Sequence, residues 1–296
     1  MRVARVSKYM ADPISGPPAK GHNSGMQRDV ALPEPRPPQA RSTPFRVAPI
    51  RTSRTRAGRP NGRPVPLLDR DPELARRLPP DELPCARSAA VAATVSVPVG
   101  PWVADMIEPH PAHLGYLVLD GVISRELQVA GGRSLELLGA GDVARPWQED
   151  SASFCTSRYH AVAPVRLAVL DEAFAERIAP WPQVSALLLE RALRRSRCLA
   201  AISAVGHVVG LEQRLVALFW CLAERWGRMS NGGVSIDLPL THQMIADLIG
   251  AQRPSVTTAL GRLSSAGTLR RTDGVWDLRG DPPPVDLDRA GVRSDG

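Results

Sequence analysis

The sequence predicts an α+β protein with three folded parts in chain order. Between residues 65 and 182, short apolar runs alternate with glycine-bearing turns, which is typical of antiparallel strands. A single long helical pattern follows at 183–207. Residues 208–280 then carry further helical patterns and end on a hairpin signal.

Residues 1–64 differ in composition from the rest of the chain. They hold 13 of the 37 Lys and Arg residues, 3 of the 30 Asp and Glu residues and 11 of the 29 prolines. We expect a disordered basic tail, because no periodic apolar pattern could bury it. Two interpretations stay open: an arm that contacts nucleic-acid phosphate, or an extension without a role, such as a start assigned too far upstream. Residues 281–296, rich in Pro and Asp, predict a second disordered end.

The totals narrow the class of protein. With 43% apolar and 23% charged residues, the composition is that of a globular protein. No apolar run is long enough to predict a membrane span, and the first residues lack the apolar stretch of a secretory signal. The cysteines share no C-x-x-C spacing, so we expect reduced thiols in a cytoplasmic protein and no metal cluster. They are Cys85, Cys155, Cys198 and Cys221.

Residues 65–182 predict a β-rich domain with a short helix in front of it. That helix should begin at Asp71 or Pro72 and end at Pro79 and Pro80. Apolar runs separated by glycine turns at intervals of about 8–12 residues then favour an antiparallel sandwich or barrel. These runs lie within 89–100, 114–129, 131–147 and 160–174.

A helix is expected from about 184 to 205, within the segment 183–207. Positions spaced alternately by four and three residues form a heptad row along it, interrupted by Arg195. We interpret the row as a seam that pairs with a second copy of the chain; packing on its own domain is the alternative. The seam residues are Leu188, Ala192, Leu199 and Ile202. The arginines at 191, 194, 195 and 197 should form a solvated face, with nucleic-acid contact as a minor alternative.

The domain 208–280 should open with an amphipathic helix and a short strand. The helix spans 211–227, and its apolar stripe predicts a core face. Val234, Ile236 and Leu238 then alternate as in a strand. The stripe consists of Leu211, Leu215, Leu218, Phe219, Leu222 and Trp226.

Two short helices follow, separated by a tight turn. Thr241 is a good N-cap for the first helix, and Gly250 should end it. The second begins near Arg253 or Pro254, because proline suits a first helical turn. Its inner face is apolar at Val256, Leu260 and Leu263. The pair therefore predicts a helix-turn-helix.

The outer face of the second helix has the chemistry of a DNA major-groove reader. Arginine can bond bidentately to a guanine edge, and Ser or Thr can reach phosphate oxygen or a thymine methyl group. Asp273 and Gly274 mark a hairpin turn, which adds a wing built from 268–271 and 275–278. We expect double-stranded DNA as the partner, since a plain helical hairpin inside another domain would need no wing. The expected DNA-binding residues are Thr241, Gln252, Arg253, Ser255, Thr257, Thr258, Arg262, Arg270 and Arg271.

At this point the chain resembles the cyclic-AMP receptor/fumarate–nitrate regulator superfamily, written Crp/Fnr, over about residues 67–280. The strongest match is 240–271, where Arg253, Ser255 and Val256 fit the family's R-x-[ST]-V opening of the recognition helix. The segment 113–142 is similar to the family's β-roll, the fold of cyclic-nucleotide-binding domains. The resemblance implies a β-roll, a dimerisation helix and a winged helix-turn-helix. It also implies a homodimer that reads a pseudo-palindromic DNA site, with RNA polymerase and a small-molecule effector as further partners.

The sensor stretch at 141–162 departs from the members that bind cyclic nucleotides. No Gly-Glu pair follows Gly141 and Asp142, and the position of the phosphate arginine falls on Cys155, next to Thr156, with Arg158 nearby. Since a buried phosphate needs a positive partner, we expect an altered sensor whose effector is unknown or absent. A cyclic-nucleotide-responsive regulator remains the alternative. The candidate effector-pocket residues are Gly141, Asp142, Cys155, Thr156 and Arg158.

Other classes of protein find little support in the residues. Residues 1–84 contain no cysteine for an N-terminal iron–sulfur cluster, and His110, His113 and His160 are too scattered to predict a haem or metal site. Neither a G-x-S-x-G elbow nor a P-loop is found. We therefore expect no enzyme and no cofactor. A metal-binding β-barrel with an accessory helical domain, or a β-roll that binds another protein, are the remaining alternatives.

Overall fold

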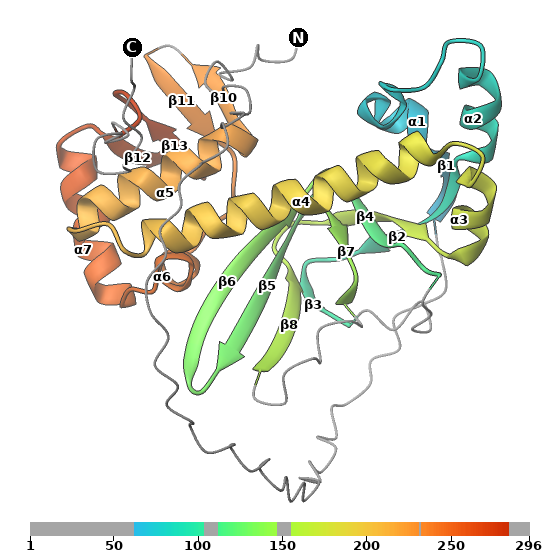
Figure 1. Ribbon diagram of the computed structural model, residues 1–296. Coiled ribbons are helices and arrows are strands. Elements are labelled where there is room, and N and C mark those ends of the chain that lie inside the picture. Colours follow the sequence, from blue (N-terminus) through green and yellow to red (C-terminus); the bar gives the residue numbers. More distant parts are fainter. Residues whose placement is uncertain (1–61, 104–111, 147–154, 231, 284–296) are drawn as a thin grey trace, which may run out of the picture. The chain divides into compact units, whose positions relative to one another are not determined.

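The computed structural model describes residues 62–103, 112–146, 155–230 and 232–283 (Figure 1). Within them the chain forms an α+β structure in which every paired strand is antiparallel to its neighbour. The tail at 1–61, the end at 284–296 and part of the sensor stretch, 147–154, lie outside the described residues. The structure therefore tests the predicted disorder only at residues 62–64 and 281–283.

Two sheets form the N-terminal β-roll. The first has five strands in the order β1–β2–β9–β4–β7, and the second has four in the order β3–β8–β5–β6. The strands are β1 (Gly62–Pro66), β2 (Val91–Val97), β3 (Gly100–Trp102), β4 (Gly115–Asp120), β5 (Val122–Val129), β6 (Gly132–Gly139), β7 (Val143–Ala144), β8 (Cys155–Ala161) and β9 (Val165–Leu170). Alternate side chains of both sheets form one core, which includes Tyr116, Ile123, Leu138 and Leu167.

Short helices form a second core with one of these sheets. They are α1 (Leu67–Arg70), a 3₁₀ turn (Pro72–Ala75), α2 (Leu83–Ala89) and α3 (Glu172–Ile178). Their apolar side chains pack with Leu117 and Leu170 of the five-stranded sheet. The helix start expected at Asp71 or Pro72 is confirmed, since the 3₁₀ turn begins at Pro72 with Asp71 as its N-cap. That turn ends at Ala75 and not at Pro79 and Pro80, and α1 before it was not predicted. The predicted tail boundary at 64 is also slightly late, since β1 begins at Gly62 and pairs with β2.

Helix α4 (Pro182–Val205) is the longest helix in the described part of the chain. Its first half buries Val184, Leu187 and Leu188 in the core beneath the β-roll's helices. Its far end packs on α5 and α6. It begins two residues before the predicted start, at the proline that suits a first helical turn.

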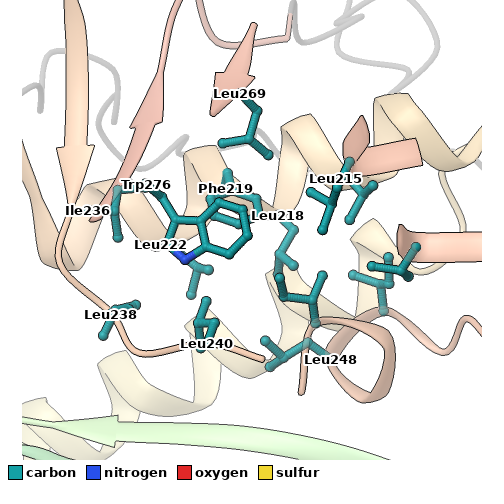
Figure 2. Packing of buried hydrophobic residues seen from close by; sticks show 14 of the residues in the cluster. Leu215, Leu218, Phe219, Leu222, Ile236, Leu238, Leu240, Leu248, Leu269 and Trp276 are labelled. Carbon is teal, nitrogen blue, oxygen red and sulfur yellow. The ribbon is translucent and has the colours of Figure 1, made fainter. Parts of the chain in front are cut away.

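The C-terminal domain follows with helices and one small sheet. Its elements are α5 (Leu211–Trp226), β10 (Gly227–Ser230), β11 (Gly233–Ile236), α6 (His242–Ile249), α7 (Arg253–Ser265), β12 (Leu269–Thr272) and β13 (Val275–Leu278). Figure 2 shows the apolar stripe of α5 facing strand and helix residues of the same domain. The rings of Phe219 and Trp276 pack with centroids 4.8 Å apart. The helix, the short strand through Val234 and Ile236 and the hairpin predicted for this domain are confirmed, but Leu238 lies beyond the strand and β10 was not predicted.

Candidate nucleic-acid interface

Helix α6 is positioned by its cap and by the turn that ends it. The Thr241 hydroxyl accepts a hydrogen bond from the Met244 N–H at 3.2 Å, as its position before the helix predicts. Gly250 ends the helix in the left-handed conformation with φ of 63°, which a side chain would disfavour. The chain can then turn sharply into α7, so that the two helices form the predicted helix-turn-helix.

Helix α7 separates an apolar inner face from a polar outer one. Val256, Ala259, Leu260 and Leu263 are buried in the domain core. All six outward residues predicted on this helix and its cap are exposed, which confirms their orientation. They are Gln252, Arg253, Ser255, Thr257, Thr258 and Arg262.

Two hydroxyl groups on this face are already engaged within the helix. Thr257 Oγ1 donates to the carbonyl of Arg253 at 3.0 Å, and Thr258 Oγ1 donates to the carbonyl of Pro254 at 3.2 Å. Their protons are thus committed in the free protein, and what they offer outward is methyl surface. This favours apolar contact with bases over donation to phosphate.

Arg262 lies at the far end of the outer face and has an ion-pair partner. Its Nη1 is 3.2 Å from Glu212 Oε1 at the start of α5, and both side chains are well exposed. The pair borders an open cleft of about 510 Å³ between the N-terminal turn of α5 and α7. Phosphate contact by Arg262 would therefore compete with a weak surface pair.

The two arginines of the wing occupy opposite faces of β12. Arg270 is exposed and lies opposite Asp277 of β13. Arg271 lies opposite Trp276, stacks over its ring at 5.2 Å and donates from Nη1 to the Leu240 carbonyl at 3.2 Å. The prediction treated them as one pair, but alternation along a strand separates them. Arg270 is the one that projects away from the domain.

His242, which sequence reasoning passed over, adjoins this face. It is the first residue of α6, and its Nδ1 lies 2.9 Å from Thr257 Oγ1 of α7. Burial, followed by the charges of Arg271 and Arg253, lowers the pKa of His242. The sequence could have indicated this residue, because a residue directly after a helix N-cap lies at the helix end where anions bind.

Helix α4 presents a different face from the predicted one. Leu188 is buried in its own domain, and Ile202 packs against the core of the C-terminal domain. The row of Leu188, Ala192, Leu199 and Ile202 therefore does not form an exposed seam. A heptad spacing predicts that residues share one side of a helix, but not which side faces solvent. Arg195, in the middle of this row, faces the β-roll.

An exposed row runs along α4 at the same spacing, displaced from the predicted row. Leu189 and Leu193 are 61% and 53% exposed, which is unusual for large apolar side chains on a packed helix. Small residues extend the row on both sides, so a partner helix could approach closely. The row consists of Ala186, Leu189, Leu193, Ser196, Ala200 and Ser203.

A buried ion cluster fixes this orientation of α4. Glu136 of β6 is only 2% exposed and accepts hydrogen bonds from Arg125 of β5 at 3.0 Å and from Arg195 Nη2 at 2.7 Å. Burial alone would raise the pKa of Glu136, but the hydrogen bonds and charges of Arg195 and Arg125 outweigh it and hold that pKa below its usual value. Arg191 is also buried, against Asp71. The prediction that Arg191 and Arg195 belong to a solvated face is therefore wrong, whereas Arg194 and Arg197 are exposed.

Comparisons with known proteins agree on one family. A family model described as a Crp-like helix-turn-helix domain matches residues 213–278. The regulatory protein CysR of Synechococcus elongatus is 38% identical over 31% of this chain and 44% of its own length. The global nitrogen regulator of Synechococcus elongatus is 30% identical over 52% of this chain and 71% of its own length. The chain belongs to the Crp/Fnr superfamily of transcription regulators.

The fold agrees with this assignment. A crystal structure of a cyclic nucleotide-binding domain containing protein from Listeria monocytogenes superimposes with a TM-score of 0.52 at 12% identity. The superposition covers 64% of this chain and 89% of the Listeria monocytogenes chain. This likeness shows that the two chains share the fold.

The sensor residues expected from the Crp/Fnr resemblance do not converge on one pocket. Thr156 and Arg158 are exposed on one face of β8, whereas Cys155 and the buried Tyr159 lie on the other. Because side chains alternate along a strand, Arg158 cannot replace an arginine at position 155. Inside the roll, Tyr159, Arg125 and Glu136 lie opposite one another on neighbouring strands.

Asp142 belongs to a contact with the DNA-binding domain, whereas the Gly141 carbonyl lies 3.4 Å from Arg191 Nη1 of α4. The Asp142 carboxylate accepts from the Gly139 N–H at 2.9 Å and forms an ion pair with Arg225 at the end of α5. A Cβ atom at Gly139 would lie 2.8 Å from Trp226 Nε1, so only glycine fits there. Assigning Asp142 to an effector pocket is therefore wrong: its carboxylate is occupied by a structural contact between the roll and α5.

The described residues contain neither a metal-binding cluster nor a membrane-spanning helix. No group of three His, Cys, Asp or Glu side chains in that part of the chain is arranged to hold a metal ion. His110 lies outside it. No described helix is long and apolar enough to cross a membrane.

Removing the buried carboxylate should destabilise the protein strongly. Replacing Glu136 by Leu should lower the free energy of unfolding by about 3–5 kcal/mol, because Arg195 and Arg125 then lose their buried partner. The double variant Glu136→Leu/Arg195→Met should lose less than the two single variants together. Urea denaturation at neutral pH measures all four proteins.

The pH dependence provides a second check. The depressed pKa means that Glu136 contributes stability above the unfolded-state value of about 4.3, and that this contribution disappears as pH falls through the lower folded-state value. The difference between wild type and Glu136→Leu should shrink over that window. Equal stability of the two proteins at neutral pH would contradict the cluster's role.

Proposed function

We propose that this Crp/Fnr regulator acts as a homodimer that reads a pseudo-palindromic DNA site, with one α7 helix in each major-groove half-site. The observation that carries the proposal is the division of α7 into a fully buried apolar face and a fully exposed polar face. Two such helices would lie about one DNA turn apart, roughly 34 Å. We expect the protein to work in the cytoplasm with no catalytic activity of its own.

We assign separate roles to the residues of the interface. Arg253, at the start of α7, reads a base edge, where guanine offers two acceptors to a guanidinium group. Gln252, Ser255, Thr257 and Thr258 contact bases or position the helix. Thr241, Arg262, Arg270 and Arg271 lie along the phosphate backbone, with Arg270 freest to do so.

The homodimer rests on the exposed row of α4. Two apolar side chains that are more than half exposed, flanked by Ala and Ser, suit a two-fold helix pair. Such a pair would orient two winged domains that are each fixed to their own roll through Asp142 and Arg225. RNA polymerase is a further proposed partner, as for other transcription regulators.

We propose that the signal is not a cyclic nucleotide. Cys155 stands where the family's phosphate arginine is expected, Arg158 faces outward, and Arg125 and Arg195 are committed to Glu136. A cyclic phosphate in the roll would need to displace this carboxylate to find a positive partner. A different small molecule, or no effector at all, agrees better with these contacts.

Replacing Arg253 by Ala should weaken binding to a selected duplex by about 1–3 kcal/mol and relax the base preference at one position of each half-site. Fluorescence anisotropy with selected and scrambled duplexes, with and without cyclic AMP, measures both effects. Arg228→Ala is the matched control, because Arg228 is exposed on β10 at the opposite edge of the wing sheet. Wild-type affinity and preference in Arg253→Ala would contradict the assignment of α7, and binding that requires cyclic AMP would contradict the proposal on the signal.

Replacing Leu193 by Glu should separate the dimer. Each of the two Leu193 side chains is 53% exposed in the single chain and would lose about 0.8–1.6 kcal/mol of burial, which raises the dissociation constant at least about tenfold. Sedimentation velocity over a concentration series measures the change. Ala201→Glu introduces the same charge at an exposed position on another side of α4 and should leave the dimer intact. A Leu193→Glu protein that remains dimeric would contradict the assigned row.

A further inference from the structure

Two basic side chains from two elements lie close to the first turn of α6. His242 opens that helix, and Arg271 of β12 donates from Nη1 to the carbonyl of Leu240, two residues before His242, at 3.2 Å. His242 hydrogen-bonds to Thr257 of α7, one turn after Arg253. The charges of both arginines act on its imidazole. The nearest carboxylate on its own helix, Asp247, is occupied by Gln243 at 2.8 Å and by Arg133 at 3.4 Å.

The N-terminus of α6 adds to this positive environment. The first N–H groups of a helix have no carbonyl partner within it, and the helix dipole places partial positive charge at that end. Thr241 satisfies the N–H of Met244. A guanidinium ion, an imidazole and a helix N-terminus together are suited to a single phosphate.

The hydrogen bonds also determine which nitrogen of His242 can gain a proton. The single proton of the Thr257 hydroxyl is donated to the Arg253 carbonyl at 3.0 Å. With its proton on that carbonyl, Thr257 Oγ1 is an acceptor for Nδ1–H of His242, which lies 2.9 Å away. In this tautomer Nε2 is the nitrogen left to be protonated.

We propose that His242 and Arg271 bind one phosphate of the DNA backbone and that His242 takes up a proton at Nε2 when they do, so that DNA affinity rises as pH falls. This inference rests on the proposed DNA-binding function and adds a form of regulation to it. In the free protein, the surrounding positive charge disfavours the imidazolium ion. A bound phosphate reverses the sign of the local field and favours it.

The direction of the effect follows from linkage. The pKa of His242 is lowered in the free protein by burial and by Arg271 and Arg253, and a phosphate anion raises it in the complex. The gain in affinity is therefore fully present below the free-protein pKa and is lost as pH rises through the pKa of the complex. A rise of one unit on binding corresponds to about a tenfold change in the dissociation constant.

The test is a pH series of DNA binding at constant ionic strength, from about pH 8.5 to about pH 5.5, where imidazole titrates. Anisotropy with one selected duplex gives the dissociation constant of wild type, His242→Gln and His160→Gln. Gln can still donate to Thr257 but cannot take up a proton. His160 is exposed on β8 of the roll and serves as the control for a general histidine effect.

We expect wild type and His160→Gln to bind about tenfold tighter at the acid end for a one-unit pKa rise, whereas His242→Gln loses most of this slope. At the alkaline end, His242→Gln should match wild type, since the imidazole is then neutral. A His242→Gln protein with the wild-type slope would overturn the inference while leaving the proposed function intact. If the wild-type protein bound no duplex selectively at either end of the pH series, both the inference and the proposed function would be overturned.

Discussion

The ion cluster around Glu136 determines how the rest of the molecule is arranged. A carboxylate buried this deeply must keep its positive partners, and one of them, Arg195, comes from the middle of α4. That contact rotates α4 so that Arg195 and Leu188 face the chain's own domain, while Leu189 and Leu193 face solvent. The surface of α4 that we propose for a second protomer is thus set by a charge inside the β-roll. A ligand that displaced either arginine from Glu136 would loosen the same helix.

The DNA-binding domain depends on this arrangement at a second point. Asp142, three residues beyond the end of β6, holds Arg225 of α5, and Gly139 lies against Trp226. The roll, α4 and the winged domain are therefore joined by two buried carboxylates, both carried by the β6 strand and the turn after it. A change within the roll would pass to α5 through contacts that are short and specific. This agrees with regulation by a signal bound in the roll, although the residues present are not those that hold a cyclic nucleotide.

Sequence reasoning predicted the elements better than their orientation. The helix-turn-helix was predictable because Thr241, Gly250 and Pro254 mark its boundaries locally, and the inner face of α7 follows from spacing alone. The exposed face of α4 was not predictable, because two rows of residues along the helix have the same spacing. Only the partner of Arg195, which is distant in the sequence, determines which row faces solvent. For the same reason Asp142 was assigned to a pocket. Its partner Arg225 lies more than eighty residues away, and no local pattern reveals the pairing.

The central claim is that two copies of the chain read one DNA site with two α7 helices. Hydroxyl-radical footprinting on a duplex selected from random DNA tests it most directly. We expect two protected backbone segments related by a dyad, with half-site centres about 10–10.5 base pairs apart. Sedimentation of the complex should show two chains for each duplex. A single protected segment, bound by one chain, would contradict it.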